Sequence, residues 1–384
     1  MNKWPHHTSE EIKLVKKILA SGKTNYLYGE YGKKFEKLFS KIIGNKYSIA
    51  VANGTIALEI AIKALNLPKK SEILVPSRSF FASASSVVQA GHTPVFTDVD
   101  YNSQNINLKY IKESITNKTK AILCVHLAGF PCDMFEISNF AKKNKLFIVE
   151  DCSQAHGAKI KNRSIGSFGD ISCWSFCFDK IISTGGEGGI ISTNSKIFFE
   201  YIWSYKDHGK NIYKYNKKTK LNKFRYIHDS FGTNGRLTEM QSAIGLLQIS
   251  KLDVNIIKRN NICNFIINSF KDFNFIKFQK VPDKYLHSYY KLYFYIDFKL
   301  FKKNIKGNDL LYEFQNKKLK INSGSCPEIY LEKAFINYKN RKNRFNNAKL
   351  LGLNSFAISI HHKMIKKDLI KITKSMKAIF RKYV

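Results

Sequence analysis

Three short segments of the sequence carry residue types that could act together on one ligand. The first is the turn Ala52–Thr55, which follows an apolar run and precedes the helical pattern TIALEIAIKAL. A turn of small residues at a helix N-terminus binds anions such as phosphate, because free N–H groups and the helix dipole both favour negative charge. The turn could equally be an ordinary helix cap, since it lacks the glycine spacing of dinucleotide and nucleoside triphosphate sites.

The second segment, Glu150–Gly157, follows the most apolar run of the chain. A carboxylate at the end of a buried strand can hold a cationic ring nitrogen or a metal. One of the two carboxylates, Glu150 or Asp151, could instead be a plain helix cap. His156 is a weak candidate for the base of a serine nucleophile, because no GxSxG turn accompanies it.

The third segment, Ser175–Gly189, places Lys180 among apolar residues just before a glycine-dense turn. Burial lowers the pKa of an amine toward the neutral form that attacks carbonyl carbons, so Lys180 could form a Schiff base. The alternative is a surface lysine beside a flexible loop, which is the common state of lysine in proteins.

The three segments together are what pyridoxal 5′-phosphate requires: a phosphate turn, an acid for the pyridinium nitrogen and an amine for the aldehyde. In this combination the sequence resembles the DegT/StrS-type sugar aminotransferases, which are fold type I enzymes of the aspartate aminotransferase superfamily. The resemblance extends over nearly the whole chain. It is carried by GKTNYLYGEYGKKFEKLF, ANGTIAL, VEDCSQAHGA, SFCFDKIISTGGEGG and FGTNGRLTEMQSAIG, in this order.

The resemblance implies roles for individual residues. Lys180 matches the lysine that carries the cofactor as a Schiff base, and Asp151 matches the carboxylate that pairs with the ring nitrogen. Asn234 matches a residue that reaches the phosphate of the neighbouring subunit's cofactor, which implies a homodimer with shared active sites. The other cofactor contacts implied are Gly54, Thr55 and Ser175 at the phosphate, Gln154 at the ring hydroxyl and Phe80 stacked on the ring.

Two positions depart from the family's pattern. Gly235 stands where the family usually has an aromatic residue, which removes bulk near the subunit boundary. His362 stands where a proline often follows the C-terminal histidine, here His361, which the resemblance places near the substrate. Neither change touches the residues that the resemblance assigns to the cofactor.

The resemblance implies transfer of an amino group from glutamate or glutamine to a nucleotide-linked keto-sugar, for surface polysaccharide or glycoconjugate biosynthesis. One alternative is a sugar dehydratase, but such relatives carry histidine at the position of Lys180. Another is an inactive regulatory or binding protein on the same fold. The joint presence of Lys180, Asp151 and Gln154 argues against that alternative.

The elements that must position these segments follow from the apolar pattern. Strands are predicted at 48–52, 72–76, 93–99, 121–127, 145–151, 171–176 and 189–193. Helical patterns separate them, and right-handed crossovers then give a mostly parallel sheet with helices on both faces. The predicted fold class is therefore α/β, with the seven-stranded type of sheet found in fold type I transferases. Such sheets bind ligands at the carboxyl ends of their strands, where the three segments begin.

The rest of the chain is predicted to form a smaller α/β domain. Apolar residues at helical spacing over 238–273 predict one or two long connecting helices. A strand pair is expected within 291–298 and a C-terminal helix over 366–380. The predicted division is a large cofactor-binding domain, residues 1–250, and a small C-terminal domain, residues 251–384.

The composition bears on partners and location. The 384 residues carry a formal charge of +35, but only eight of the 64 basic residues are arginine and they are scattered. We therefore expect a solvated lysine-rich surface and no nucleic-acid partner, with 206–224 as a surface loop. The seven cysteines lack CxxC spacing, so neither a zinc site nor a disulfide framework is predicted. With no signal-peptide pattern and no run of roughly 20 apolar residues, we expect a cytoplasmic protein without a membrane partner.

Overall fold

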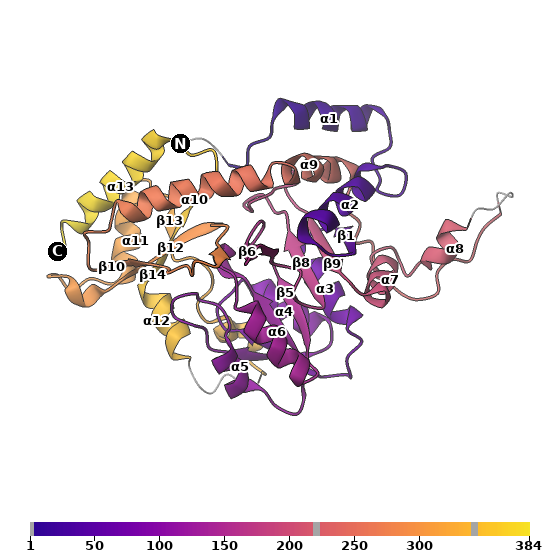
Figure 1. Ribbon diagram of the computed structural model, residues 1–384, viewed down its shortest axis with the longest axis horizontal. Helices are drawn as coiled ribbons and strands as arrows, with labels where there is room; N and C mark the ends of the chain where they lie inside the picture. The colour runs from indigo at the N-terminus through magenta and orange to yellow at the C-terminus, as the bar shows by residue number, and fades with distance from the viewer. Residues whose placement is uncertain (1–3, 218–222, 339–344) are drawn as a thin grey trace.

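The computed structural model describes residues 4–217, 223–338 and 345–384, and a seven-stranded sheet lies at its centre (Figure 1). The strand order is β1-β9-β8-β5-β4-β2-β3. The strands are β1 (Tyr47–Val51), β2 (Glu72–Pro76), β3 (Thr93–Thr97), β4 (Thr119–Val125), β5 (Phe147–Asp151), β8 (Ile171–Ser175) and β9 (Gly189–Thr193). Only β9 runs antiparallel to its neighbours, so the predicted mostly parallel α/β sheet is confirmed.

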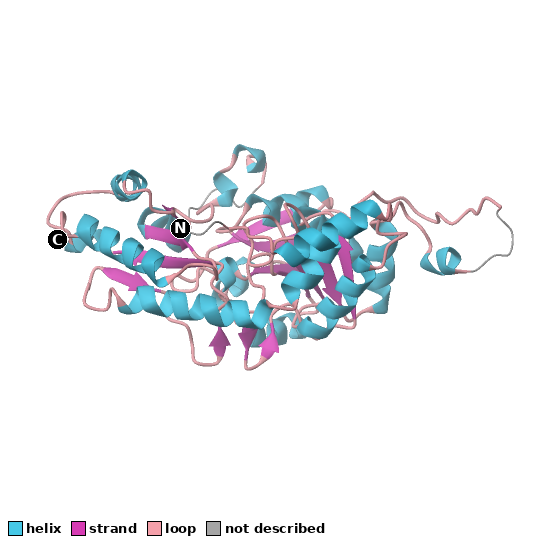
Figure 2. Ribbon diagram, turned by 90° about the horizontal axis from the view of Figure 1, so that it is seen from above, coloured by secondary structure: helices cyan, strands magenta, loops and turns pink. Residues whose placement is uncertain are grey.

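Helices cover both faces of this sheet (Figures 1 and 2). One face carries α2 (Tyr31–Ile43), α5 (Leu108–Ser114), α6 (Met134–Lys143) and α9 (Glu239–Ile249), and α1 (Ser9–Ala20) packs against α9. The other face carries α3 (Gly54–Ala64), α4 (Phe81–Gln89) and α7 (Lys196–Tyr205). Successive strand side chains point to opposite faces, so Leu74 lies in one core while Ile73 and Val75 lie in the other.

A second, four-stranded sheet has the order β10-β12-β14-β13 and is antiparallel throughout. Its strands are β10 (Ile276–Phe278), β12 (Lys291–Ile296), β13 (Ile321–Asn322) and β14 (Ser355–Ser359). The helices here are α11 (Gly307–Asn316), α12 (Asn346–Asn354) and α13 (Lys366–Phe380), and α13 has its predicted bounds. The predicted strand pair within 291–298 is wrong, because these residues form the single strand β12, which pairs with β10 and β14.

The helix α10 (Leu252–Asn268) joins the two sheets (Figure 1). Its first half contributes Leu252 and Ile256 to the core of the large sheet, and its second half contributes Ile262 and Ile266 to the core of the small one. One continuous helix buried at both ends connects the two parts. The division at residue 250 stays a prediction.

Short elements complete the fold. A small sheet pairs β11 (Tyr285–Leu286) with β6 (Lys159–Ile160), and β6 with β7 (Arg163–Ser164). Turns of 3₁₀ helix lie at Leu127–Gly129, Phe298–Leu300, Ile329–Leu331 and Lys333–Phe335. Within the described residues, no helix combines the length and apolar composition needed to cross a bilayer.

The segment predicted as a surface loop, 206–224, contains the short helix α8 (Ile212–Asn216) and projects from the body of the molecule (Figures 1 and 2). Asn211 begins this helix, because its side chain accepts hydrogen bonds from the amides of Tyr213 and Lys214. The prediction is thus corrected for 212–216, and residues 218–222 lie outside the described residues.

Candidate active site

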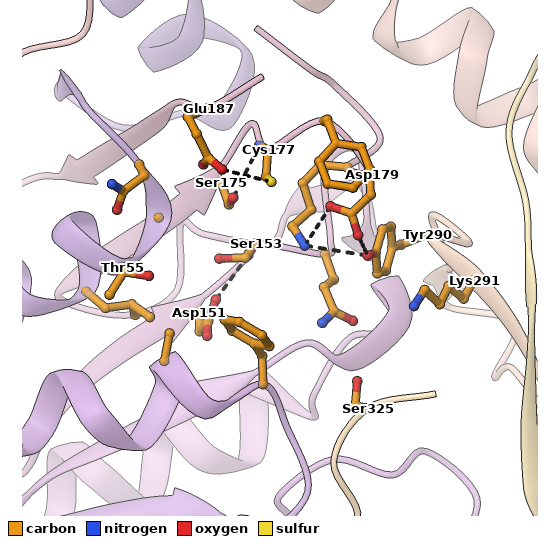
Figure 3. Close-up of a pocket in the computed structure, with 18 of the residues that line it drawn as sticks. Thr55, Asp151, Ser153, Ser175, Cys177, Asp179, Glu187, Tyr290, Lys291 and Ser325 are labelled. Atoms are coloured by element: carbon orange, nitrogen blue, oxygen red, sulfur yellow. Dashed lines mark hydrogen bonds and ion pairs between the residues drawn. The ribbon is translucent and has the colours of Figure 1, made fainter. Parts of the chain in front are cut away.

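A cavity of about 700 Å³ opens at the carboxyl edge of the seven-stranded sheet (Figure 3). Strands β1, β5 and β8 all end at this edge, and the loop that leads to β12 closes the opposite side. Seven of the eight residues predicted to bind the cofactor line it: Gly54, Thr55, Phe80, Asp151, Gln154, Ser175 and Lys180.

One end of the cavity is built to receive an anion. The helix α3 begins at Gly54, and Asn53 caps it by accepting the Ile56 amide at 2.9 Å. The amides of a first helical turn have no partner within the helix, and Gly54 and Thr55 line the cavity at the positive end of the helix dipole. A Cβ at position 54 would lie 2.7 Å from the Cβ of Ser175, so only glycine allows α3 to approach β8 this closely. Asn53 therefore caps α3, and the chemistry of this turn suits an anion.

Asp151 lies deeper in the cavity with only 5% of its surface exposed. Its Oδ2 accepts a hydrogen bond from the Ser83 hydroxyl at 2.8 Å, and its Oδ1 accepts one from the Ser153 amide at 3.1 Å. Neither donor carries a positive charge. A buried carboxylate is stable when it is paired with a cation, so this site suits a protonated ring nitrogen.

Glu150 points away from the cavity and belongs to the interior. It is fully buried and accepts hydrogen bonds from the amides of Gly166, Phe168 and Gly169, with His126 at 3.2 Å. Burial alone would raise the pKa of Glu150, but the bonds from His126 and these amides lower it. The sequence left open whether Glu150 or Asp151 is a helix cap. Glu150 caps no helix, and instead it ties the loop at 166–169 to β5.

One further prediction near the cavity concerns His156. His156 is buried beside Trp174 and Phe176, and burial together with the charges of Lys180 and Arg259 lowers its pKa to about 3. It is therefore neutral near pH 7 and lies outside the residues that line the cavity. 

The aromatic and amide residues of the site differ in how they are held. The ring of Phe80 is 65% exposed at the start of α4, and such an exposed apolar ring beside a cavity suits stacking against a planar ligand. Gln154 is buried, and its Oε1 accepts the Ala128 amide at 2.7 Å. This bond fixes the side chain and leaves its NH₂ group for a ligand.

The amine of Lys180 lies inside the site. Its side chain is 16% exposed, and its Nζ lies 3.3 Å from Asp179 Oδ1 and 3.5 Å from Tyr290 Oη. The surface-lysine alternative is thus wrong. Sequence reasoning missed Asp179, although it is adjacent, because an acid beside a lysine is unremarkable in isolation. It missed Tyr290 because this residue reaches the site from the start of β12, far along the chain.

Asn234 does not line this cavity within the described residues. It is exposed on the segment after α8 and pairs through its backbone with Asp207. Its neighbour Gly235 is buried, donates its amide to the Lys206 carbonyl and accepts the Ala52 amide. A Cβ at Gly235 would come no closer than 3.4 Å to Ile56, which is ordinary van der Waals contact.

A smaller cavity of about 270 Å³ adjoins the first and shares Phe178, Asp179, Tyr290 and Lys291 with it. His361 lines this second cavity, where burial and the Arg259 charge lower its pKa to about 4. Trp4 also lines it, stacks on His361 at 6.3 Å between ring centroids, and donates from Nε1 to the Lys180 carbonyl at 3.1 Å. No sequence signal pointed to Trp4, because contact between the N-terminal segment and residue 180 depends on the tertiary fold.

Comparisons with known proteins agree with this geometry. The chain matches the DegT/DnrJ/EryC1/StrS aminotransferase family over residues 5–377. An aminotransferase from Psychrobacter cryohalolentis has a crystal structure that superimposes with a TM-score of 0.96, at 38% identity over 99% of both chains. GDP-perosamine synthase from Escherichia coli O157:H7 is 39% identical over 236 residues, and the match spans 62% of each chain. The dTDP-3-amino-3,6-dideoxy-alpha-D-galactopyranose transaminase of Aneurinibacillus thermoaerophilus is 36% identical over 71% of each chain. The chain belongs to the DegT/DnrJ/EryC1/StrS aminotransferase family, whose cofactor is pyridoxal phosphate.

Proposed function

We propose that the protein transfers an amino group from glutamate or glutamine to a nucleotide-linked keto-sugar. The observation that carries the proposal is the gathering of Lys180, Asp151 and the Gly54 turn around one cavity. The names of the relatives support the acceptor class, because they act on GDP- and dTDP-linked sugars. Products of this class are building blocks of surface polysaccharides and glycoconjugates.

The residues present fit pyridoxal phosphate. Because position 54 is glycine, the N-terminus of α3 lies close to Ser175, and this N-terminus supplies amides for the phosphate. Asp151 would face the ring nitrogen and Phe80 would cover the ring. Lys180 brings its amine to the same cavity, so each chemical group of the cofactor has a partner of matching chemistry.

Each of these residues has a definite task in an amino transfer. Pyridoxal phosphate, when bound, supplies an aldehyde carbon and a ring that accepts electrons when a proton leaves the amino donor. Asp151 holds a proton on the ring nitrogen, which keeps the ring a good acceptor. The amine of Lys180 would act as the base that takes the proton from the α-carbon of the donor and would then hold that proton for its return. Phe80 restricts the tilt of the ring and shields it from water.

Lys180 also separates this function from the two alternatives. The dehydratases of the family carry histidine at this position, and a binding protein would not require an amine held within a cavity. We propose the transaminase for this reason. A cytoplasmic location stays a prediction of the sequence.

The proposal is tested by incubating the holoenzyme with ¹⁵N-glutamate and GDP-, dTDP- or UDP-linked keto-sugars. Mass spectrometry should find ¹⁵N in one amino sugar nucleotide and 2-oxoglutarate as co-product. A sugar product that has lost water without gaining nitrogen would establish the dehydratase instead. Absence of both products with all acceptors would count against the proposal.

We further propose that the protein acts as a homodimer with shared active sites. Three aromatic side chains at the end of the projecting segment and just after it are almost wholly exposed: Phe224 (81%), Tyr226 (87%) and Phe231 (98%). Monomeric surfaces rarely present such a group, which is typical of an interface between subunits. Asn234 follows these residues and is exposed away from its own cavity, as a residue that serves the partner's site would be.

Mixing two defective subunits tests this sharing. Lys180→Ala removes the amine, and Asn234→Asp places a negative charge where we expect the partner's phosphate, so each homodimer should be inactive. In a hybrid dimer one site would combine both defects and the other would be intact. Random co-assembly gives half hybrids, so about one quarter of the wild-type activity should return. Activity no greater than that of the separate variants would contradict shared sites.

A further inference from the structure

The amine of Lys180 has its own partners within the cavity, apart from the residues that suit the cofactor. Its Nζ contacts the Asp179 carboxylate and the Tyr290 hydroxyl, and lies 4.9 Å from the centroid of the Tyr290 ring. Figure 3 shows Asp179 and Tyr290 on the opposite side of the cavity from Thr55 and Ser175. Asp179 and Tyr290 are therefore partners of the amine that are separate from the residues suited to the phosphate.

Hydrogen bonds hold Tyr290 in place, and Asp179 carries a negative charge. Tyr290 is 6% exposed, its amide donates to the Ala128 carbonyl at 2.8 Å, and its hydroxyl donates to Asp179 Oδ2. Burial alone would raise the pKa of Asp179, but Lys180, Tyr290 and Lys291 lower it, so the carboxylate is ionised at neutral pH. Burial and the Asp179 charge raise the pKa of Tyr290, which therefore keeps its proton and remains a donor.

We propose that Asp179 and Tyr290 form a docking site for the amine of Lys180, which the amine occupies while it carries a proton and is not attached to the cofactor. The inference rests on the proposed function. Both residues act on the substrate through Lys180, so they are positioning residues in this reaction.

The chemistry of attachment makes the two states of Lys180 unequal at this docking site. When the neutral amine joins the aldehyde, a carbon–nitrogen double bond forms and both N–H hydrogens leave with the aldehyde oxygen as water. The free ammonium has three N–H donors and a full charge for Asp179, Tyr290 and the ring face. The attached nitrogen has at most one N–H, directed within the cofactor's own site. Asp179 therefore stabilises the free lysine relative to the attached one.

Asp179→Asn is the direct test, because the amide keeps the shape and removes the charge. Destabilising the free lysine should tighten the binding of pyridoxal phosphate to the apoenzyme by about 3- to 10-fold, as expected for a partly exposed ion pair. The equilibrium with glutamate should shift toward the attached form by the same factor, since both equilibria compare the same two states of Lys180. Equilibrium dialysis and the visible spectrum measure the two constants.

Pyridoxamine phosphate separates this effect from simple repulsion between Asp179 and the anionic cofactor. It has no aldehyde and leaves Lys180 free, so the docking site predicts unchanged affinity for it in Asp179→Asn. Repulsion alone would tighten the binding of both compounds equally and would overturn the inference, as would weaker or unchanged affinity for pyridoxal phosphate.

Two further variants keep the test decisive. Tyr290→Phe retains the ring and removes the hydroxyl, so it should shift both equilibria in the same direction by a smaller factor, even if Asp179→Asn folds poorly. The exposed Asp272→Asn makes the same chemical change on the surface and should shift neither. If wild-type protein binds pyridoxal phosphate without attaching it to Lys180, the proposed function fails. If attachment occurs and Asp179→Asn leaves it unaltered, only the docking site fails.

Discussion

Lys180→Ala is expected to lower turnover at least about a thousandfold while leaving the protein folded, because positioned acid–base groups contribute factors of this size. The side chain is both the point of attachment and the group that moves the proton. It borders a cavity, so its removal leaves the surrounding core in place. Turnover should be measured with glutamate and the best acceptor, and folding by circular dichroism.

Chemical rescue distinguishes a missing amine from a damaged site. Methylamine is small enough to enter the space left by the side chain and should restore part of the activity of Lys180→Ala in proportion to its concentration. Lys271 is an exposed lysine in the turn after α10, so Lys271→Ala provides the matched control and should keep wild-type turnover. A Lys180→Ala protein within tenfold of the wild-type rate would contradict the assignment.

Asp151→Asn is expected to reduce kcat by about 100- to 1000-fold, the range seen when a fixed electrostatic partner of a reacting group is removed. The amide keeps the shape of the side chain: its oxygen can accept from the Ser153 amide, and its NH₂ group can donate to the Ser83 hydroxyl, but it cannot balance the charge of a protonated ring nitrogen. Cofactor should still bind, since the phosphate site is intact. The loss should therefore appear in kcat, measured at saturating substrates with the cofactor content determined separately.

The neighbouring acid supplies the contrast for this variant. Glu150 lies outside the cavity. Glu150→Gln disturbs the hydrogen bonds that Glu150 accepts from the amides of Gly166 and Gly169, so it should lower the free energy of unfolding by about 1–3 kcal/mol. Its folded form should keep kcat within a few-fold. If instead Glu150→Gln loses activity and Asp151→Asn keeps it, the two carboxylates have been assigned the wrong way round.

The large sheet was predictable because each of its strands is a short apolar run between helical patterns. The observed strand ends differ from the predicted ones by at most two residues. The small sheet was harder, since β12 pairs with strands whose sequences are short and distant. The Asn211 cap of α8 was a local signal that could have revealed that helix.

The residues of the site likewise fall into those that the local sequence predicts and those that it does not. Lys180, Asp151 and Gly54 lie at strand ends, where local sequence and sheet geometry suffice to bring them together. Trp4 and Tyr290 reach the same cavities from distant parts of the chain, and no spacing records their contact with residue 180. Asn234 lies away from the cavity of its own chain, and its predicted contact with a partner's cofactor requires a second subunit.

Reduction of the holoenzyme with borohydride, followed by peptide mass spectrometry, tests the central claim most directly. The visible absorption band of bound cofactor should disappear, and one stable pyridoxyl group should be found on Lys180, in a chain that contains many other lysines. Lys180→Ala treated in the same way should carry none. A colourless protein that takes up no cofactor, or an adduct on another lysine, would contradict the account.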